Sequence, residues 1–231
     1  MSIGPLENYT YVKFDHEYAA GNCEPNVYKP GYGLFNGDNS VFRKCLYGKE
    51  SFDYALEYGK KFWIAYKNNK RFVRIVCTYS HVYSYEKAKY TDNSLHDFLK
   101  ELFEKDQLKN TIIFIAADHG FQLMGIYKIM NSKDFLIETN LPLLFLIVPD
   151  KKNYTYKQQY REIIKNQQTL ITSFDIFYTL RYIIYHENYK KFNLNGNNND
   201  GEYLFKNIDP KERTCKKYQQ MDKSTCQCIK F

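Results

Sequence analysis

A short apolar run, Ile112 to Ala117, ends directly in Asp118, His119 and Gly120, with no intervening turn residue. Its length and its isoleucines predict a β-strand that is buried on both faces. In open parallel sheets, ligands bind beyond the carboxyl ends of the strands. Asp118 and His119 are therefore candidate ligand-binding residues at such an end.

An ionised aspartate and a neutral histidine lose hydration at the end of a buried strand, and a divalent metal ion compensates both. Successive side chains of a strand point to opposite faces. Asp118 and His119 therefore reach one ion only if the chain bends at once, which Gly120 permits. In the alternative interpretation, Asp118 caps a following helix and His119 is hydrogen-bonded in the turn. The motif alone leaves both interpretations open.

The remaining pattern predicts an α/β domain with a mostly parallel sheet and flanking helices, because predicted helices and strands alternate along the chain. Residues 1–45 are rich in turn-forming residues and predict irregular surface structure. The polar stretch 193–202 predicts a loop that separates a domain of residues 1–200 from a short cysteine-containing tail, 201–231. The predicted elements are helices over 51–67, 91–103 and 173–184, and strands over 72–79, 112–117 and 143–148.

The charge pattern does not favour a nucleic-acid partner. The formal net charge is +7, from 33 basic and 26 acidic residues, but the basic residues are spread along the whole chain, which is typical of solvated lysines. The apolar stretch 141–149 is too short to span a membrane. The first 14 residues lack the basic and apolar regions of a secretion signal.

Six cysteines point to an oxidising compartment. Cys77 lies in an apolar run and is predicted to be a buried thiol. Cys215, Cys226 and Cys228 have a spacing that fits disulfides better than a zinc site. An oxidising compartment without a secretion signal suggests that an N-terminal part of a larger protein is missing.

The segment SLHDFLKELFEKDQLKNTIIFIAADHG, residues 94–120, resembles the sulfatase and alkaline-phosphatase superfamily. The stretches LPLLFLIVP and TSFDIFYTLRYI resemble the strand and helix that follow in that superfamily. Segments 22–62 and 201–228 narrow the resemblance to an uncharacterised sulfatase-like branch, a domain of unknown function. The chain resembles the C-terminal half of that domain, so an incomplete alkaline-phosphatase-like fold is expected.

The resemblance implies a metal-dependent hydrolase of sulfate or phosphate esters. It assigns Asp118 and His119 as ligands of a divalent ion, Ca²⁺, Mn²⁺ or Zn²⁺. It places His81 where the superfamily has a histidine that contacts substrate or metal; an exposed loop histidine is the alternative. The pair Asp15–His16 is better explained as a surface pair. Asp175 matches a family position but is explained structurally as a helix-start residue.

The superfamily's other metal-binding aspartate and its nucleophile belong to the N-terminal half, and residues 1–70 carry neither motif. We therefore expect a truncated or inactive form that lacks both and pairs with that half to act on an anionic ester. One alternative is a non-catalytic extracellular binding domain on the same scaffold. Another is an unrelated basic module that binds polyanions. The cysteines place the protein outside the cell or in the secretory lumen.

Overall fold

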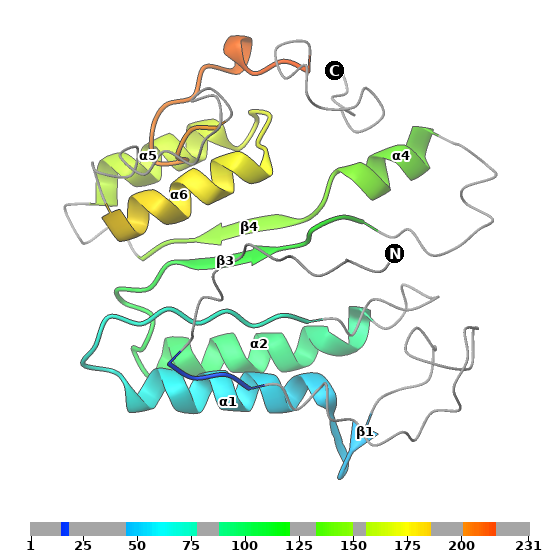
Figure 1. Cartoon of the computed structure of the whole chain (residues 1–231), viewed down its shortest axis with the longest axis vertical. Helices are drawn as coiled ribbons and strands as arrows, with labels where there is room; N and C mark the ends of the chain where they lie inside the picture. The colour runs from blue at the N-terminus through cyan, green and yellow to red at the C-terminus, as the bar shows by residue number, and fades with distance from the viewer. Residues whose placement is uncertain are drawn as a thin grey trace, which may run out of the picture. The chain divides into compact units, whose positions relative to one another are not determined.

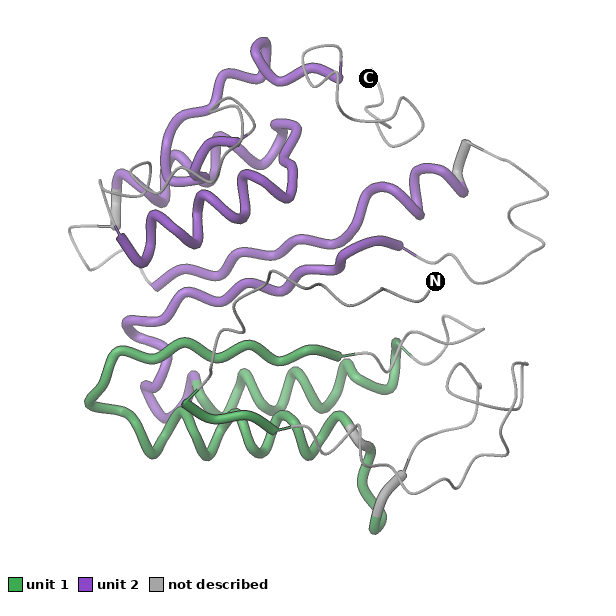
Figure 2. Tube along the Cα trace, viewed as in Figure 1, with its two compact units in different colours: residues 1–102 green, residues 103–231 purple. Residues whose placement is uncertain are grey.

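The structure is a computed structural model that describes residues 15–18, 45–77, 88–120, 133–149, 156–185 and 201–215. The chain divides into two compact units, residues 1–102 and residues 103–231 (Figure 2). The predicted division into one domain over residues 1–200 and a tail over 201–231 stays a prediction.

A tight hairpin introduces the first helix of the first unit. Strands β1 (Cys45–Leu46) and β2 (Lys49–Glu50) pair antiparallel. Tyr47 and Gly48 between them have φ values of 48° and 80°, as required in a two-residue hairpin turn. Helix α1 (Ser51–Ala65) follows directly and confirms the helix predicted over 51–67.

Aromatic side chains line one side of α1. Tyr18 stacks on Tyr58 with a ring separation of 4.7 Å. His16 meets the edge of Phe62 at 5.3 Å, and its Nε2 lies 2.7 Å from the hydroxyl of Tyr66. The second helix, α2 (Ala88–Glu104), confirms the helix predicted over 91–103 and begins three residues earlier. The buried leucines of this unit are Leu56 and Leu102, which are 5% and 3% exposed.

The strand predicted over 72–79 is not observed in its described part. Residues 70–77 form neither helix nor strand, although their burial alternates as it would in a strand. Val73 and Ile75 are half-buried and face Gly59 of α1, whereas Phe72 and Val76 are 63% and 61% exposed. Burial therefore alternates along this segment as in a strand, but the segment has no strand partner in the described part of the chain.

The sheet of the second unit is antiparallel, not parallel as predicted (Figure 1). Strands β3 (Ile113–Ala116) and β4 (Leu144–Ile147) lie within the predicted ranges and pair from Ile113↔Ile147 to Ala116↔Leu144. Apolar runs specify strands but not their relative direction, which depends on the path of the connection between them. The described residues show this small antiparallel sheet, and a mostly parallel sheet is not shown.

The two strands are less buried than their composition predicted. No residue of β3 or β4 is fully buried, and the side chains of β4 alternate between half-buried and exposed. Leu143, Phe145 and Ile147 are 50%, 55% and 43% exposed. Such runs are typical of strands that are covered on both faces, so this sheet exposes apolar surface that the fold has not covered within the described residues.

Two helices of the second unit, α4 (Lys133–Asn140) and α5 (Tyr156–Asn166), were not predicted. The predicted helix over 173–184 is α6 (Ser173–Tyr185). Its most buried side chains are polar: Asp175 and Thr179 are both 0% exposed. The apolar pattern therefore located this helix correctly but did not identify its buried face.

The segment 201–215, which contains the short 3₁₀ helix η4 (Pro210–Glu212), packs against α5 and α6 (Figure 1). Tyr203 stacks on Tyr182 of α6 with a ring separation of 4.3 Å. The beginning of the predicted tail is therefore integrated in the second unit. Its buried apolar side chains are Leu204, Phe205 and Ile208.

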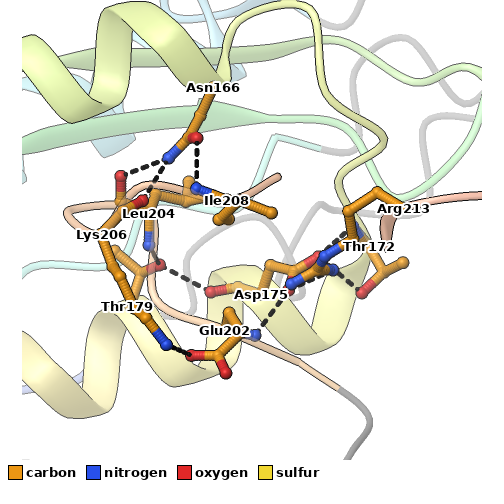
Figure 3. A network of polar contacts seen from close by, with 9 residues as sticks. All are labelled: Asn166, Thr172, Asp175, Thr179, Glu202, Leu204, Lys206, Ile208 and Arg213. Atoms are coloured by element: carbon orange, nitrogen blue, oxygen red, sulfur yellow. Dashed lines mark hydrogen bonds and ion pairs between the residues drawn. The ribbon is translucent and has the colours of Figure 1, made fainter. Parts of the chain in front are cut away.

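A polar network, which we call the clasp, holds this segment (Figure 3). It consists of Asn166, Thr172, Asp175, Thr179 and Arg213 and the backbone they bind. Asp175 accepts hydrogen bonds from the backbone N–H and the hydroxyl of Thr172, at 2.7 and 2.9 Å, so it closes the first turn of α6. It also accepts the N–H of Glu202 and binds the guanidinium of Arg213 at 2.8 Å. Asp175 is thus structural, as expected for a helix-start residue.

The environments predicted for two cysteines can be compared with the structure. Cys77 is exposed, which contradicts the prediction of a buried thiol. Its segment packs on one face only, so the apolar run around it does not enclose it. Cys215 is disulfide-bonded. Within the described part of the chain, none of the helices combines the length and hydropathy that crossing a bilayer requires.

Candidate metal centre

Asp118 and His119 lie immediately beyond β3, at its carboxyl end. The backbone N–H of Ala117 donates to the carbonyl of Leu143 at 2.9 Å, so the pairing with the β4 side continues one residue past the strand. The chain then bends at Asp118 and His119. The bend that two neighbouring ligands require is therefore present.

The bend brings both side chains to the same side. The carboxylate Oδ1 of Asp118 accepts the backbone N–H of His119 at 3.0 Å, and its Oδ2 lies 3.7 Å from Nε2 of His119. Zinc bonds to nitrogen and oxygen are roughly 2.0–2.2 Å long, so two donors of one ion lie roughly 3–4 Å apart. The side chains of Asp118 and His119 are 90% and 40% exposed. The two donors fit one divalent ion, and solvent reaches them.

The ring of His119 is oriented by the next peptide group. Its Nδ1 lies 2.7 Å from the carbonyl oxygen of Gly120. A carbonyl oxygen only accepts hydrogen bonds, so Nδ1 carries the proton. In the neutral imidazole, Nε2 then has a free lone pair on the side of the Asp118 carboxylate. Metal-binding histidines are typically held in this way, with the second nitrogen donating to a backbone carbonyl.

Gly120 is required by a close approach of two backbones. Its N–H donates to the carbonyl of Thr139 at 2.9 Å. A side-chain Cβ on Gly120 would lie 2.7 Å from the carbonyl carbon of Glu138, and closer still to its oxygen. Its φ lies outside the left-handed region. The sequence predicted a glycine that permits a bend, and the structure adds that this glycine lets the turn dock on the last residues of α4.

Comparison with known proteins identifies the family of the chain. A family model described as "Protein of unknown function (DUF229)" matches residues 35–231. The chain belongs to the DUF229 family. This family is sulfatase-like, in agreement with the resemblance of the sequence. No curated protein and no solved structure matches the chain.

The other candidate residues of this DUF229 chain are His81 and the pair Asp15–His16. His81 lies outside the described residues, so its predicted role stays a prediction. His16 contacts the aromatic side chains of α1 and is exposed, in line with a surface residue. Across the described ranges, no three histidine, cysteine, aspartate or glutamate side chains are grouped to hold a metal ion. Among those residues, Asp118 and His119 form a pair of donors.

A separate depression of about 240 Å³ lies in the first unit of the DUF229 chain, between α1 and α2. Its two amines, Lys49 and Lys60, are bound by Glu57 and Glu101. The hydrogen bond from Lys49 lowers the pKa of Glu57 and raises the pKa of Lys49. With both lysines neutralised and further carboxylates in its lining, this depression does not favour an anionic ester.

The sequence pattern pointed to Asp118 and His119 as candidates but gave no sign of what holds them. The carbonyl of Gly120 and the last residues of α4 orient the pair through backbone atoms. Every residue has these atoms, so no pattern of residue types in the sequence indicates such contacts. The glycine after the pair was the one signal. Its packing against residues 138–139 depends on where α4 ends, which the sequence did not predict.

Proposed function

We propose that this chain forms part of a metal-dependent hydrolase domain of the sulfatase-like type, which acts on sulfate or phosphate esters. Asp118 and His119 supply two ligands of its divalent ion. The observation that carries the proposal is the free Nε2 lone pair of His119 beside the Asp118 carboxylate, at the carboxyl end of β3. The membership of the sulfatase-like DUF229 family supports it.

The donor types favour certain ions. Imidazole nitrogen is a good ligand for zinc, and carboxylate oxygen suits manganese, zinc and calcium. Calcium prefers oxygen ligands throughout, so a mixed pair favours Mn²⁺ or Zn²⁺. When bound, the ion would neutralise charge on the transferred group and activate a hydroxyl nucleophile. His81 is proposed to contact the ester or the ion from the segment that follows residue 77.

We further propose that an N-terminal half of the same domain supplies the nucleophile and the remaining metal-binding aspartate. The chain by itself is then inactive. Two observations support this proposal. Apolar side chains of β4 are exposed, and among the described residues β3 and β4 each have a single strand partner. A two-stranded sheet is marginal in water, so further strands from that half would stabilise it.

Metal binding is tested by thermal unfolding with Ca²⁺, Mn²⁺ or Zn²⁺. At about tenfold excess over Kd, an ion that binds only the folded chain stabilises it by ~1.4 kcal/mol. For a chain of this size, the expected rise in Tm is roughly 3–6 °C. We expect the rise with Mn²⁺ or Zn²⁺, and we expect Asp118→Ala to abolish it because the charged donor of the pair is lost.

Asp97→Ala is the matched control, because Asp97 forms another exposed pair with a neighbouring histidine, His96, at 2.9 Å. This variant should keep the full metal response. Equal responses in wild type and Asp118→Ala would refute the ligand assignment. A cooperative transition without any metal response would instead favour the non-catalytic binding domain on the same scaffold.

The compartment is tested by thiol labelling. We propose an extracellular or secretory-lumen location, supported by the disulfide at Cys215. In the native chain isolated without reductant, at least two of Cys215, Cys226 and Cys228 should resist alkylation until a reductant is added. Cys77, which is exposed, is the internal control and should label at once. Immediate labelling of all three tail cysteines contradicts an oxidising compartment.

A further inference from the structure

The metal-ligand turn is attached to α4 through a single peptide unit. Residue Gly120 contacts its surroundings in three ways, all through backbone atoms. Its N–H donates to Thr139 O at 2.9 Å, its Cα packs without space for a methyl group beside Glu138, and its carbonyl accepts Nδ1–H of His119 at 2.7 Å. The first two contacts fix the position of Gly120, and the third orients the imidazole of His119 relative to it.

We propose that the C-terminal turn of α4 is the positioning element of this centre: through Gly120 it selects the His119 tautomer whose Nε2 is free for the metal. The inference rests on the proposed metal role of Asp118 and His119. A histidine without this carbonyl can carry its proton on Nε2 instead. That proton would point toward the Asp118 carboxylate and would occupy the lone pair that the ion needs.

The C-terminal end of α4 also has a polarity that favours a nearby cation. The last four carbonyls of a helix have no partner within the helix, and this end carries a partial negative charge. The carbonyl of Ile137 is satisfied by the N–H of Leu141 at 2.9 Å, and that of Thr139 by Gly120. The turn that bears Asp118 and His119 therefore docks where a helix favours a cation. Unwinding of this turn of α4 would release the imidazole.

The test compares Gly120→Ala with Gly201→Ala. Both replacements add a methyl group that meets backbone: at Gly201 it would lie 2.8 Å from the carbonyl carbon of Phe174, in the clasp region. Both should lower Tm, but only Gly120→Ala disturbs the docking of the turn. One readout is the tautomer of His119 in the metal-free chain, from ¹⁵N NMR of the imidazole at a pH where it is neutral. The other is the affinity for Mn²⁺ and Zn²⁺, from calorimetry.

We expect wild type and Gly201→Ala to carry the His119 proton on Nδ1 and to bind metal equally. Gly120→Ala should show the Nε2-protonated form and about 10–100-fold weaker metal binding, the usual effect of losing the partner that orients a ligand. A wild-type ring protonated on Nε2 overturns the inference. So does an unchanged tautomer in Gly120→Ala, or an equal loss of affinity in both variants.

A second pair of variants covers the case in which Gly120→Ala fails to fold. Glu138 is an exposed residue of α4. Glu138→Gly loosens the last turn of this helix, whereas Glu138→Ala removes the same carboxylate and favours the helix. Only the glycine variant should shift the tautomer and weaken metal binding. If wild type binds no metal, the proposed function fails, and the tautomer still reports on the positioning by α4.

Discussion

Replacing Arg213 by methionine is expected to lower the free energy of unfolding by about 3–5 kcal/mol, because it leaves the carboxylate of Asp175 buried without its cation. Asp175 is 0% exposed, and the side chain of Arg213 is 5% exposed. The guanidinium lies 2.8 and 2.9 Å from the two oxygens. Urea denaturation of the chain with its disulfide intact measures the loss.

Two comparisons make this prediction specific. Lys206 forms an exposed ion pair with Glu202 at 3.3 Å, and exposed pairs of this kind contribute about 0–1 kcal/mol. Lys206→Met should therefore change stability little. Adding Asp175→Asn to Arg213→Met should recover part of the loss, since the uncompensated charge disappears. If Arg213→Met is as mild as Lys206→Met, the buried pair does not hold segment 201–215.

Replacing Asn166 by alanine is expected to lower the free energy of unfolding by about 3 kcal/mol or more, since a buried polar group left without a partner costs about 1–3 kcal/mol. Asn166 is 4% exposed. Its amide nitrogen donates to the carbonyls of Leu204 and Lys206 at 2.9 and 2.7 Å, and its oxygen accepts the N–H of Ile208 at 3.1 Å. The replacement leaves three backbone groups without these partners.

The matched control is Asn207→Ala, because Asn207 is exposed in the same segment. It should be close to neutral in the same urea experiment. Hydrogen exchange adds a local readout: in Asn166→Ala, the amide of Ile208 should lose protection before the amides of β3. Full protection of Ile208 in Asn166→Ala would mean that the packing of Leu204 and Phe205 is sufficient to hold the segment.

The elements with strong local signals were predicted correctly. The 3.6-residue spacing of apolar side chains located α1, α2 and α6 to within a few residues, and unbroken apolar runs located β3 and β4. Helix α4 escaped because it is only eight residues long, whereas α5 carries Tyr156, Tyr160, Ile163 and Ile164 at helical spacing and could have been predicted. The strand expected over 72–79 failed in its described part for a different reason: alternation reports burial on one face, whereas a strand also needs a partner.

The candidate site also combines features indicated by local sequence with features that depend on tertiary contacts. Asp118 and His119 became candidates because two polar side chains follow an apolar strand directly, and their role as ligands stays a prediction. The orientation of His119 was not found, since it depends on one carbonyl and on the end of α4. Asp175 shows the converse: its sequence position suggested a helix start, and its contact with Arg213, 38 residues away, emerged only in three dimensions.

The sequence by itself determined the helices with a clear apolar spacing, the two apolar strands and the pair of candidate metal ligands. These follow from local properties, namely side-chain periodicity and the position of two polar side chains directly after an apolar run. Only the tertiary structure decided the antiparallel direction of the strands, the docking of Gly120 on α4 and the clasp around Asp175. These depend on contacts between residues far apart in the chain, which close only when the whole unit folds, so no local pattern encodes them.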